Sequence, residues 1–235
     1  MPANAAAASP SRLLETWEEG QGQHPLHRAL TMLRMAEPDV PIAALAELPV
    51  GERDRRLLYA RAMLFGSRLD AIAHCPACKE PIEAALAAED LAQPPPRPAL
   101  GELELDGRTL PIRLPTTLDL LEAAEAPVEQ RRAVLLERCT GERLTGAEAD
   151  AVEARMAEID PLAEIELHFD CPACGHGWEE LFDIASWLWV EIGDCAQRLL
   201  SEVDLLARAY GWSEAEILSL PPRRRSHYLR LVAGG

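Results

Sequence analysis

The sequence is poor in aromatic residues and in positive charge, and it has no long apolar run. Phe, Trp and Tyr make up 5% of its 235 residues, and 39 acidic side chains stand against 23 Lys and Arg, for a net charge of −16. Because phosphate binding draws mainly on Lys and Arg, this balance argues against a nucleic-acid partner. No apolar stretch approaches the roughly 18 residues that a membrane-spanning helix needs. We therefore expect a soluble protein with neither a membrane nor a nucleic acid as partner.

The signatures of common enzyme sites are also missing. The chain contains no G-x-S-x-G nucleophile motif, no phosphate-binding loop and no G-x-G-x-x-G dinucleotide motif. Residues 1–10 lack the basic and apolar regions of a secretion signal, and they read as a short disordered tail. We expect a cytoplasmic protein that is not an enzyme and has no small-molecule substrate.

Ala and Leu dominate what is there, which favours helices packed on helices. In the N-terminal helical region, residues 11–68, Ser11 is expected to cap a first helix, and Pro25 suits the first turn of a second. A third helix should begin near Gly51. Apolar residues at helical spacing therefore predict a helical first quarter of the chain.

Helical periodicity returns in residues 116–160, where Thr145 and Glu148 have the spacing of a capping box. Residues 116–170 carry 14 acidic and 5 basic side chains, which is read as a solvated acidic face. Before this stretch, the proline-rich residues 94–98 predict a linker. The turn at Asp106 and Gly107 then predicts a β-hairpin.

Residues 183–235 predict a C-terminal helical arm. One helix of about 42 Å should run from Asp183 to Tyr210, because apolar residues recur every three or four positions. Gly211 suits the left-handed residue that ends it, Ser213 begins a second capping box, and a last helix opens after Pro221. The run 187–190, Trp-Leu-Trp-Val, is apolar around the whole helix. It indicates either a helix buried on every side or a tryptophan that meets a partner protein.

Four of the six cysteines lie in two Cys-Pro-Ala-Cys turns, each between two segments with strand-like alternation. Zn²⁺ takes four thiolates in a tetrahedron, and the turns supply that number. The four candidate ligands of one structural zinc ion are Cys75, Cys78, Cys171 and Cys174. Ninety-two residues separate the pairs, so residues 69–182 predict a split zinc ribbon with the hairpin and the helical stretch inserted.

Other roles for the cysteines fit the sequence less well. A redox motif of the thioredoxin kind begins a helix, which neither turn does. Four thiolates leave no open position for a catalytic water. The nearby His74, His168 and His176 are alternative ligands. The first turn is also expected to be less regular than the second, because Lys79 occupies the position that the flexible Gly175 has in the second turn.

The remaining cysteines, Cys139 and Cys195, are expected in the core. The arm ends in four arginines without an acidic residue across 221–235. We interpret this tip as a docking element for an acidic surface, with the protein's own acidic insertion as the alternative. The candidate contacts are Trp212, Arg223, Arg224 and Arg225.

Two stretches carry a family resemblance. The sequence Leu-Pro-Val-Gly-Glu-Arg-Asp at 48–54, with Leu57-Leu58 and Phe65-Gly66, and the segment 206–221, with Trp-Ser-Glu-Ala-Glu-Ile-Leu, resemble proteins of contractile phage tails and bacterial contractile injection systems. The whole is similar to the T-even phage baseplate hub assembly chaperone family. The resemblance implies a chaperone-like factor for building the baseplate, with baseplate, hub or spike proteins as partners. A permanent baseplate subunit, incorporated into the particle, is the close alternative, and a zinc-ribbon nucleic-acid adaptor is a third. The expected fold is mainly α with a small β zinc ribbon.

Overall fold

A computed structural model of the chain describes residues 9–93, 100–105 and 107–234. The predicted tail (1–8 of it), the proline-rich linker and Asp106 of the predicted turn lie outside these residues. The described chain is mainly helical with small antiparallel sheets, so the expected α+β class is confirmed at that level. It divides into two compact units, one formed by Met1–Asp39 with Ser186–Gly235 and the other by Val40–Ala185.

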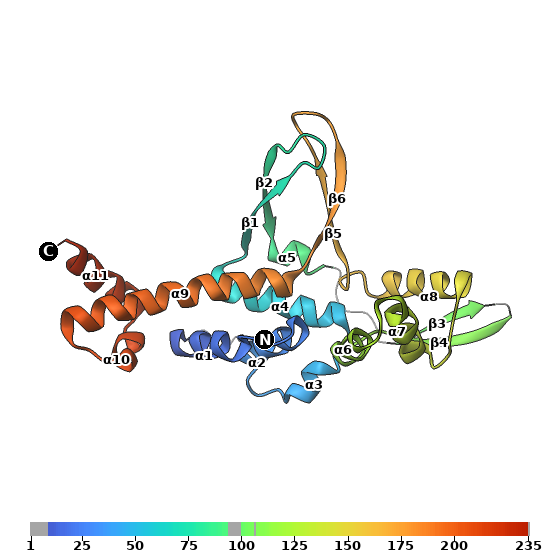
Figure 1. The fold of residues 1–235 in the computed structure, drawn as a ribbon, viewed down its shortest axis with the longest axis horizontal. Helices are drawn as coiled ribbons and strands as arrows, with labels where there is room; N and C mark the ends of the chain where they lie inside the picture. Colours follow the sequence, from blue (N-terminus) through green and yellow to red (C-terminus); the bar gives the residue numbers. More distant parts are fainter. Residues whose placement is uncertain (1–8, 94–99, 106, 235) are drawn as a thin grey trace. The chain divides into compact units, whose positions relative to one another are not determined.

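The first unit is entirely helical in its described residues (Figure 1). Its elements are α1 (Pro10–Gly20), α2 (Pro25–Ala36), α9 (Ile184–Tyr210, which begins in the second unit), α10 (Glu214–Ser219) and α11 (Pro222–Ala233). The predicted cap at Ser11 is wrong by two residues. The side chain of Ser9 accepts a hydrogen bond from the Arg12 backbone N–H, and the proline after it occupies the first turn, where a missing N–H costs nothing.

Helices α1 and α9 pack through a tryptophan and a glycine from each. A Cβ at Gly20 would come within 3.0 Å of the Trp189 ring, so only glycine fits beneath it. In return Gly193 lies under Trp17, at an ordinary contact distance of 3.7 Å. The guanidinium of Arg28 lies over the Trp189 ring, with its central carbon 5.1 Å from the ring centroid. The expectation of a helix buried on every side at 187–190 is wrong, because Val190 is 60% exposed.

The C-terminal helices follow the predicted pattern. Gly211 has a φ of +70° and ends α9, and Ser213 makes the predicted capping box with Glu216 at the start of α10. The ring of Trp212 stacks on Tyr210 at 4.6 Å and meets Tyr228 edge to face at 4.8 Å, which ties α11 to the end of α9.

The second unit combines helices with three two-stranded sheets. Its helical elements are α3 (Ile42–Ala46), α4 (Val50–Phe65), α5 (Ala88–Leu91), α6 (Thr117–Glu125), a 3₁₀ turn η2 (Val128–Gln130), α7 (Arg131–Thr140) and α8 (Gly146–Ile159). The strands form the antiparallel hairpins β1 (Arg68–His74) with β2 (Pro81–Ala87), β3 (Leu100–Leu105) with β4 (Arg108–Arg113), and β5 (Ile165–Asp170) with β6 (Gly177–Phe182). In Figure 1 the first and third hairpins extend together from the helices.

The middle hairpin and the acidic helices share a small core. Alternate residues of β3 and β4 turn one face onto α7 and α8, as a strand period of two requires. The buried members of this cluster are Leu110, Ile112, Leu136, Leu144, Ala149 and Val152. The segment that the sequence marks as acidic is therefore packed on the hairpin that precedes it.

Asp119 organises the charges of this region. Its side chain is 2% exposed, closes a capping box with Thr116, and accepts hydrogen bonds from Arg113 and Arg138. Burial raises the pKa of Asp119, but these hydrogen bonds outweigh it and hold the pKa well below its usual range. The capping box predicted at Thr145 is wrong, because that side chain makes no cap hydrogen bond.

The start of α4 is attached to the acidic region. The Gly51 N–H donates to the Asp160 carboxylate at 2.9 Å, and a Cβ on Gly51 would collide with that carboxylate. Two residues on, the buried Arg53 pairs with Asp54 at 2.7 Å and reaches Thr117. The stretch at 48–54 is thus a junction between segments far apart in the sequence.

Candidate metal centre

The two Cys-Pro-Ala-Cys turns have the same backbone hydrogen bonds. In the first, the Lys79 N–H donates to the Cys75 carbonyl at 2.9 Å, and the Cys75 N–H donates to the Glu80 carbonyl at 3.0 Å. In the second, the Gly175 N–H donates to the Cys171 carbonyl at 2.8 Å, and the Cys171 N–H donates to the His176 carbonyl at 2.9 Å. Each turn is therefore a closed knuckle at the tip of a hairpin.

The sequence-based expectation that the first knuckle is less regular is wrong. Lys79 has a φ of +67° and Gly175 a φ of +72°, and Lys79 is the one non-glycine residue with positive φ among those described. A lysine held in this left-handed region costs about 1–2 kcal/mol relative to its preferred conformations. The hairpin and its hydrogen bonds impose the knuckle shape at that cost.

The knuckles bring all four candidate sulfurs together. The Sγ atoms of Cys75, Cys78, Cys171 and Cys174 lie within 4.8 Å of one another. Between the hairpins, Cys75 and Cys174 are 3.7 Å apart, and Cys78 and Cys171 are 3.5 Å apart. The first cysteine of each pair is buried and the second is exposed. The cluster thus joins two hairpins whose cysteines are separated by 92 residues of sequence.

These distances fit a metal site and not disulfides. A disulfide requires two sulfurs about 2.05 Å apart, and all four cysteines are free. Four thiolates about 2.3 Å from a central ion, at the corners of a tetrahedron, are about 3.8 Å from each other. The two distances between the hairpins agree with this value, so the four cysteines could hold a metal ion.

The thiols also influence one another's protonation. Burial raises the pKa of Cys75, but hydrogen bonds from the backbone N–H groups of Cys78 and Ala77 outweigh it and lower the pKa to about 6. A backbone hydrogen bond at Glu80 lowers the pKa of Cys78, but contacts with the neighbouring thiols, Cys171 first, raise it to about 12. Metal ligation requires the deprotonated sulfurs, so metal binding here is expected to release protons.

The three histidines near the cysteines lie outside this cluster, as far as the described residues show. His168 is exposed on β5, 3.7 Å from Asp170 and 3.8 Å from Glu179. His176 lies with its ring over Trp178, at 6.3 Å between centroids, and His74 is exposed. The ligand set is therefore the four cysteines.

The predicted contact residues of the C-terminal arm have different environments. Arg225 is buried and pairs with Glu202 of α9 at 2.6 Å, so it holds the arm together internally. Arg223 and Arg224 are exposed, and Trp212 is half-buried in the aromatic cluster. Arg230 is also exposed and lies two turns after Arg223 on the same helix, but it is not among the predicted contact residues. The sequence does carry a signal for it: His227 and Arg230 follow Arg223 by four and seven residues, which places the three on one side of a helix.

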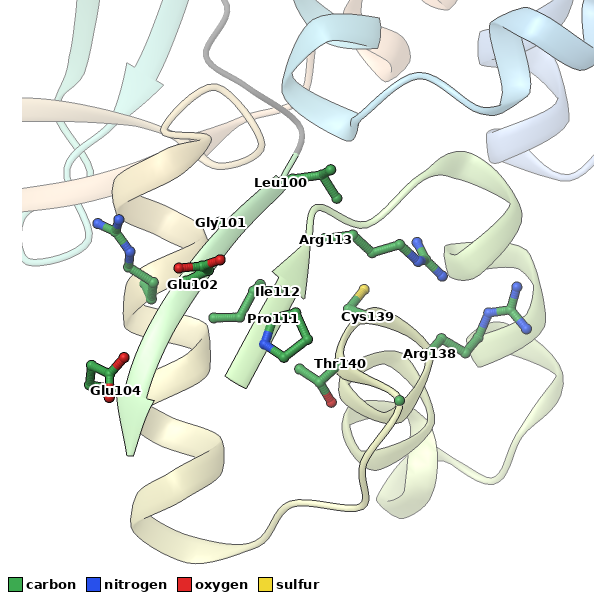
Figure 2. A pocket seen from close by; sticks show the side chains of 12 residues that line it. Leu100, Gly101, Glu102, Glu104, Pro111, Ile112, Arg113, Arg138, Cys139 and Thr140 are labelled. Carbon is green, nitrogen blue, oxygen red and sulfur yellow. The ribbon is translucent and has the colours of Figure 1, made fainter. Parts of the chain in front are cut away.

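A groove of about 880 Å³ lies between the β3–β4 hairpin and α7 (Figure 2). Two of its arginines, Arg113 and Arg138, are bound to Asp119, and Arg155 pairs with Glu158. Cys139 lies in its wall. This thiol is buried as predicted, and burial raises its pKa to about 11, so it stays protonated at neutral pH. The other cysteine expected in the core, Cys195, is only half-buried.

In comparisons with protein-family models, curated proteins and solved structures, none matches the chain. Within the residues that the structure describes, no helix has both the length and the apolar character needed to cross a bilayer.

Proposed function

We propose that the chain is a zinc-containing, non-enzymatic assembly factor for the baseplate of a contractile phage tail or contractile injection system, acting in the bacterial cytoplasm. The observation that carries the structural half of this proposal is the cysteine cluster. Four sulfurs from two distant hairpins lie within 4.8 Å of one another, which suits an ion that fastens the hairpins. The baseplate half rests on the sequence resemblance at 48–54 and 206–221.

Zinc is the metal that this donor set favours. Four thiolates in tetrahedral arrangement are typical of zinc and of iron–sulfur chemistry. Two short Cys-x-x-C knuckles on facing hairpins are the usual frame of a structural zinc ion. With all four positions filled by protein, such an ion has no place for a reacting water, which supports a structural role over a catalytic one.

The clamp would give the protein a rigid shape for holding partners. Structural zinc binding is worth on the order of 10 kcal/mol and is coupled to folding. Zinc would thus fix the tips of β1–β2 and β5–β6, and through them the segments on either side of the acidic insertion. Baseplate, hub or spike proteins are the partners that the resemblance implies.

Deleting the gene in the bacterium that encodes it, and restoring it with variants, tests this function. Wild type and Cys195→Ser, whose cysteine lies outside the cluster, should restore contractile particles. Cys171→Ser should not. Equal particle yields from Cys171→Ser would contradict the proposal.

Mass spectrometry of the purified particles separates the two baseplate roles. An assembly factor is absent from the finished particle, whereas a permanent structural subunit is present at constant stoichiometry. A nucleic-acid adaptor is opposed by the net charge of −16, and tight filter binding of DNA or RNA at low salt would favour it instead.

A further inference from the structure

The arginines of α11 differ from most others in the chain. Elsewhere most arginines have a partner. Arg12, Arg28 and Arg131 donate to backbone carbonyls, and Arg198 of α9 is an exception among the described residues. Ion pairs with acidic side chains form at Arg34, Arg53, Arg55, Arg56, Arg68, Arg108, Arg113, Arg132, Arg138, Arg143, Arg155 and Arg208. In the part of the chain that the structure describes, Arg223, Arg224 and Arg230 have no ion-pair partner. These three exposed cations stay unneutralised on a chain with 39 acidic residues.

The exposed cations share one side of the helix. Residues three, four and seven apart are neighbours on a helix surface, so Arg223, His227 and Arg230 form one stripe. Arg224 and Leu231 form the adjacent stripe, in which Leu231 is 53% exposed. We call these five residues the arginine face; Tyr228 borders it but packs on Trp212. The buried Arg225 is excluded from it, because its side chain is bound to Glu202.

Stability of the helix does not account for this face. Arg223 and Arg224 lie in the first turn of α11, where the helix dipole disfavours cations by a few tenths of a kcal/mol. The cap residue, Pro221, offers no side-chain hydrogen bond to offset this. These two arginines therefore slightly lower the stability of the helix, and no ion pair within the described chain offsets that loss.

We propose that the arginine face binds an acidic helical segment of a partner protein. Guanidinium groups pair with carboxylates in two-pronged geometry, and three of them at helical spacing match acidic residues at the same spacing on a facing helix. The exposed Leu231 offers an apolar contact beside the charged stripe, and apolar contacts are concentrated in the cores of protein interfaces. The inference rests on the proposed function in one respect, since both assign the chain a protein partner.

Charge complementarity favours a protein over the other anionic partners. A nucleic acid or an anionic bilayer presents an extended negative surface, which the net charge of −16 repels beyond the small basic patch. A folded partner needs only a local acidic face. The arginine face therefore fits an acidic helix better than a phosphate polymer or a lipid surface.

Fluorescence anisotropy with the full chain tests this proposal. The probe is a labelled amphipathic helical peptide with glutamates along one face and leucines at its edge, and its control carries Gln in place of Glu. The triple variant Arg223→Gln/Arg224→Gln/Arg230→Gln should bind the Glu peptide on the order of 10-fold more weakly than wild type, and added salt should weaken wild-type binding. Arg198→Gln removes an exposed cation from α9, and its affinity should stay within about 2-fold.

The proposal is overturned by equal affinity for the Glu and Gln peptides, or by unchanged binding in the triple variant. Tighter binding to phosphatidylserine vesicles or single-stranded DNA than to the Glu peptide also overturns it. So does sedimentation showing that the triple variant loses self-association, which would make a second copy the occupant. Gene replacement separates the two proposals. If the triple variant assembles particles normally while the gene deletion does not, the arginine face fails and the assembly role stands.

Discussion

The two knuckles differ at one backbone position, which makes the clamp open to a quantitative test. Lys79 and Gly175 adopt the same left-handed conformation, with φ values of +67° and +72°. Lys79→Gly should relieve about 1–2 kcal/mol of strain. About 0.4–1 kcal/mol is returned, because glycine makes the unfolded chain more flexible. The expected gain is about 1 kcal/mol in the free energy of unfolding.

Thermal unfolding and metal competition measure this gain. A gain of about 1 kcal/mol raises the Tm of a chain this long by about 2–4 °C. If the lysine is strained only in the metal-bound knuckle, Lys79→Gly should instead raise the affinity for zinc about 5-fold. Competition with a chromophoric chelator measures that affinity. Gly175→Ala and Gly175→Lys should both lose about 1 kcal/mol, which separates the backbone from the added charge.

Two controls make the test specific. Lys79→Arg keeps both charge and strain and should behave as wild type. The exchange Lys79→Gly/Gly175→Lys moves the strain from one knuckle to the other, so its effect should be near zero. If Lys79→Gly changes neither the Tm nor the zinc affinity and Gly175→Lys is harmless, lysine is not strained at these positions and the reasoning fails.

Other substitutions test the packing and the charges. Gly20→Ala should lower the free energy of unfolding by about 1–3 kcal/mol, because the new Cβ would overlap the Trp189 ring. Gly193→Ala should leave the free energy of unfolding unchanged or raise it by up to about 1 kcal/mol. Equal effects of the two substitutions in urea denaturation would refute this packing. Asp119 has a lowered pKa in the folded chain, so its contribution is full above its ordinary pKa and is lost as the pH falls through the folded value. Asp119→Asn should therefore cost stability at pH 7 and flatten the loss towards acid, and a melting profile against pH that matches wild type would count against this account. Arg225→Gln should cost about 2–3 kcal/mol by leaving Glu202 without its partner, while Arg223→Gln should stay within about 0.5 kcal/mol in the same assay.

The features of the fold that depend on residues close together in the sequence could be predicted from local patterns. Alternating apolar residues predicted the strands that lead into Cys75 and Cys171, and the structure places strands there. The Ser213 capping box and the left-handed Gly211 were likewise visible in a few adjacent residues. The pairing of the two knuckles followed from ligand count, since one ion needs all four sulfurs.

Tertiary contacts decided the features that the sequence did not predict. Glu148 has the spacing of a capping box, but in the structure it pairs with Arg108 of the hairpin. The tryptophan at 189 finds its glycine in α1, far away along the chain. Arg225 looks equivalent to its two neighbours in the sequence, and only the position of Glu202 separates it from them. No local pattern carries this information.

The metal content of the purified chain tests the central claim most directly. Protein prepared without added metal, and measured by elemental mass spectrometry, should contain one zinc per chain in wild type and in Cys195→Ser. Cys171→Ser should lose the zinc and melt at a markedly lower temperature, because zinc binding is coupled to folding. A zinc ratio near zero in the wild type, with the four cysteines joined in two disulfides or holding iron, would contradict the account.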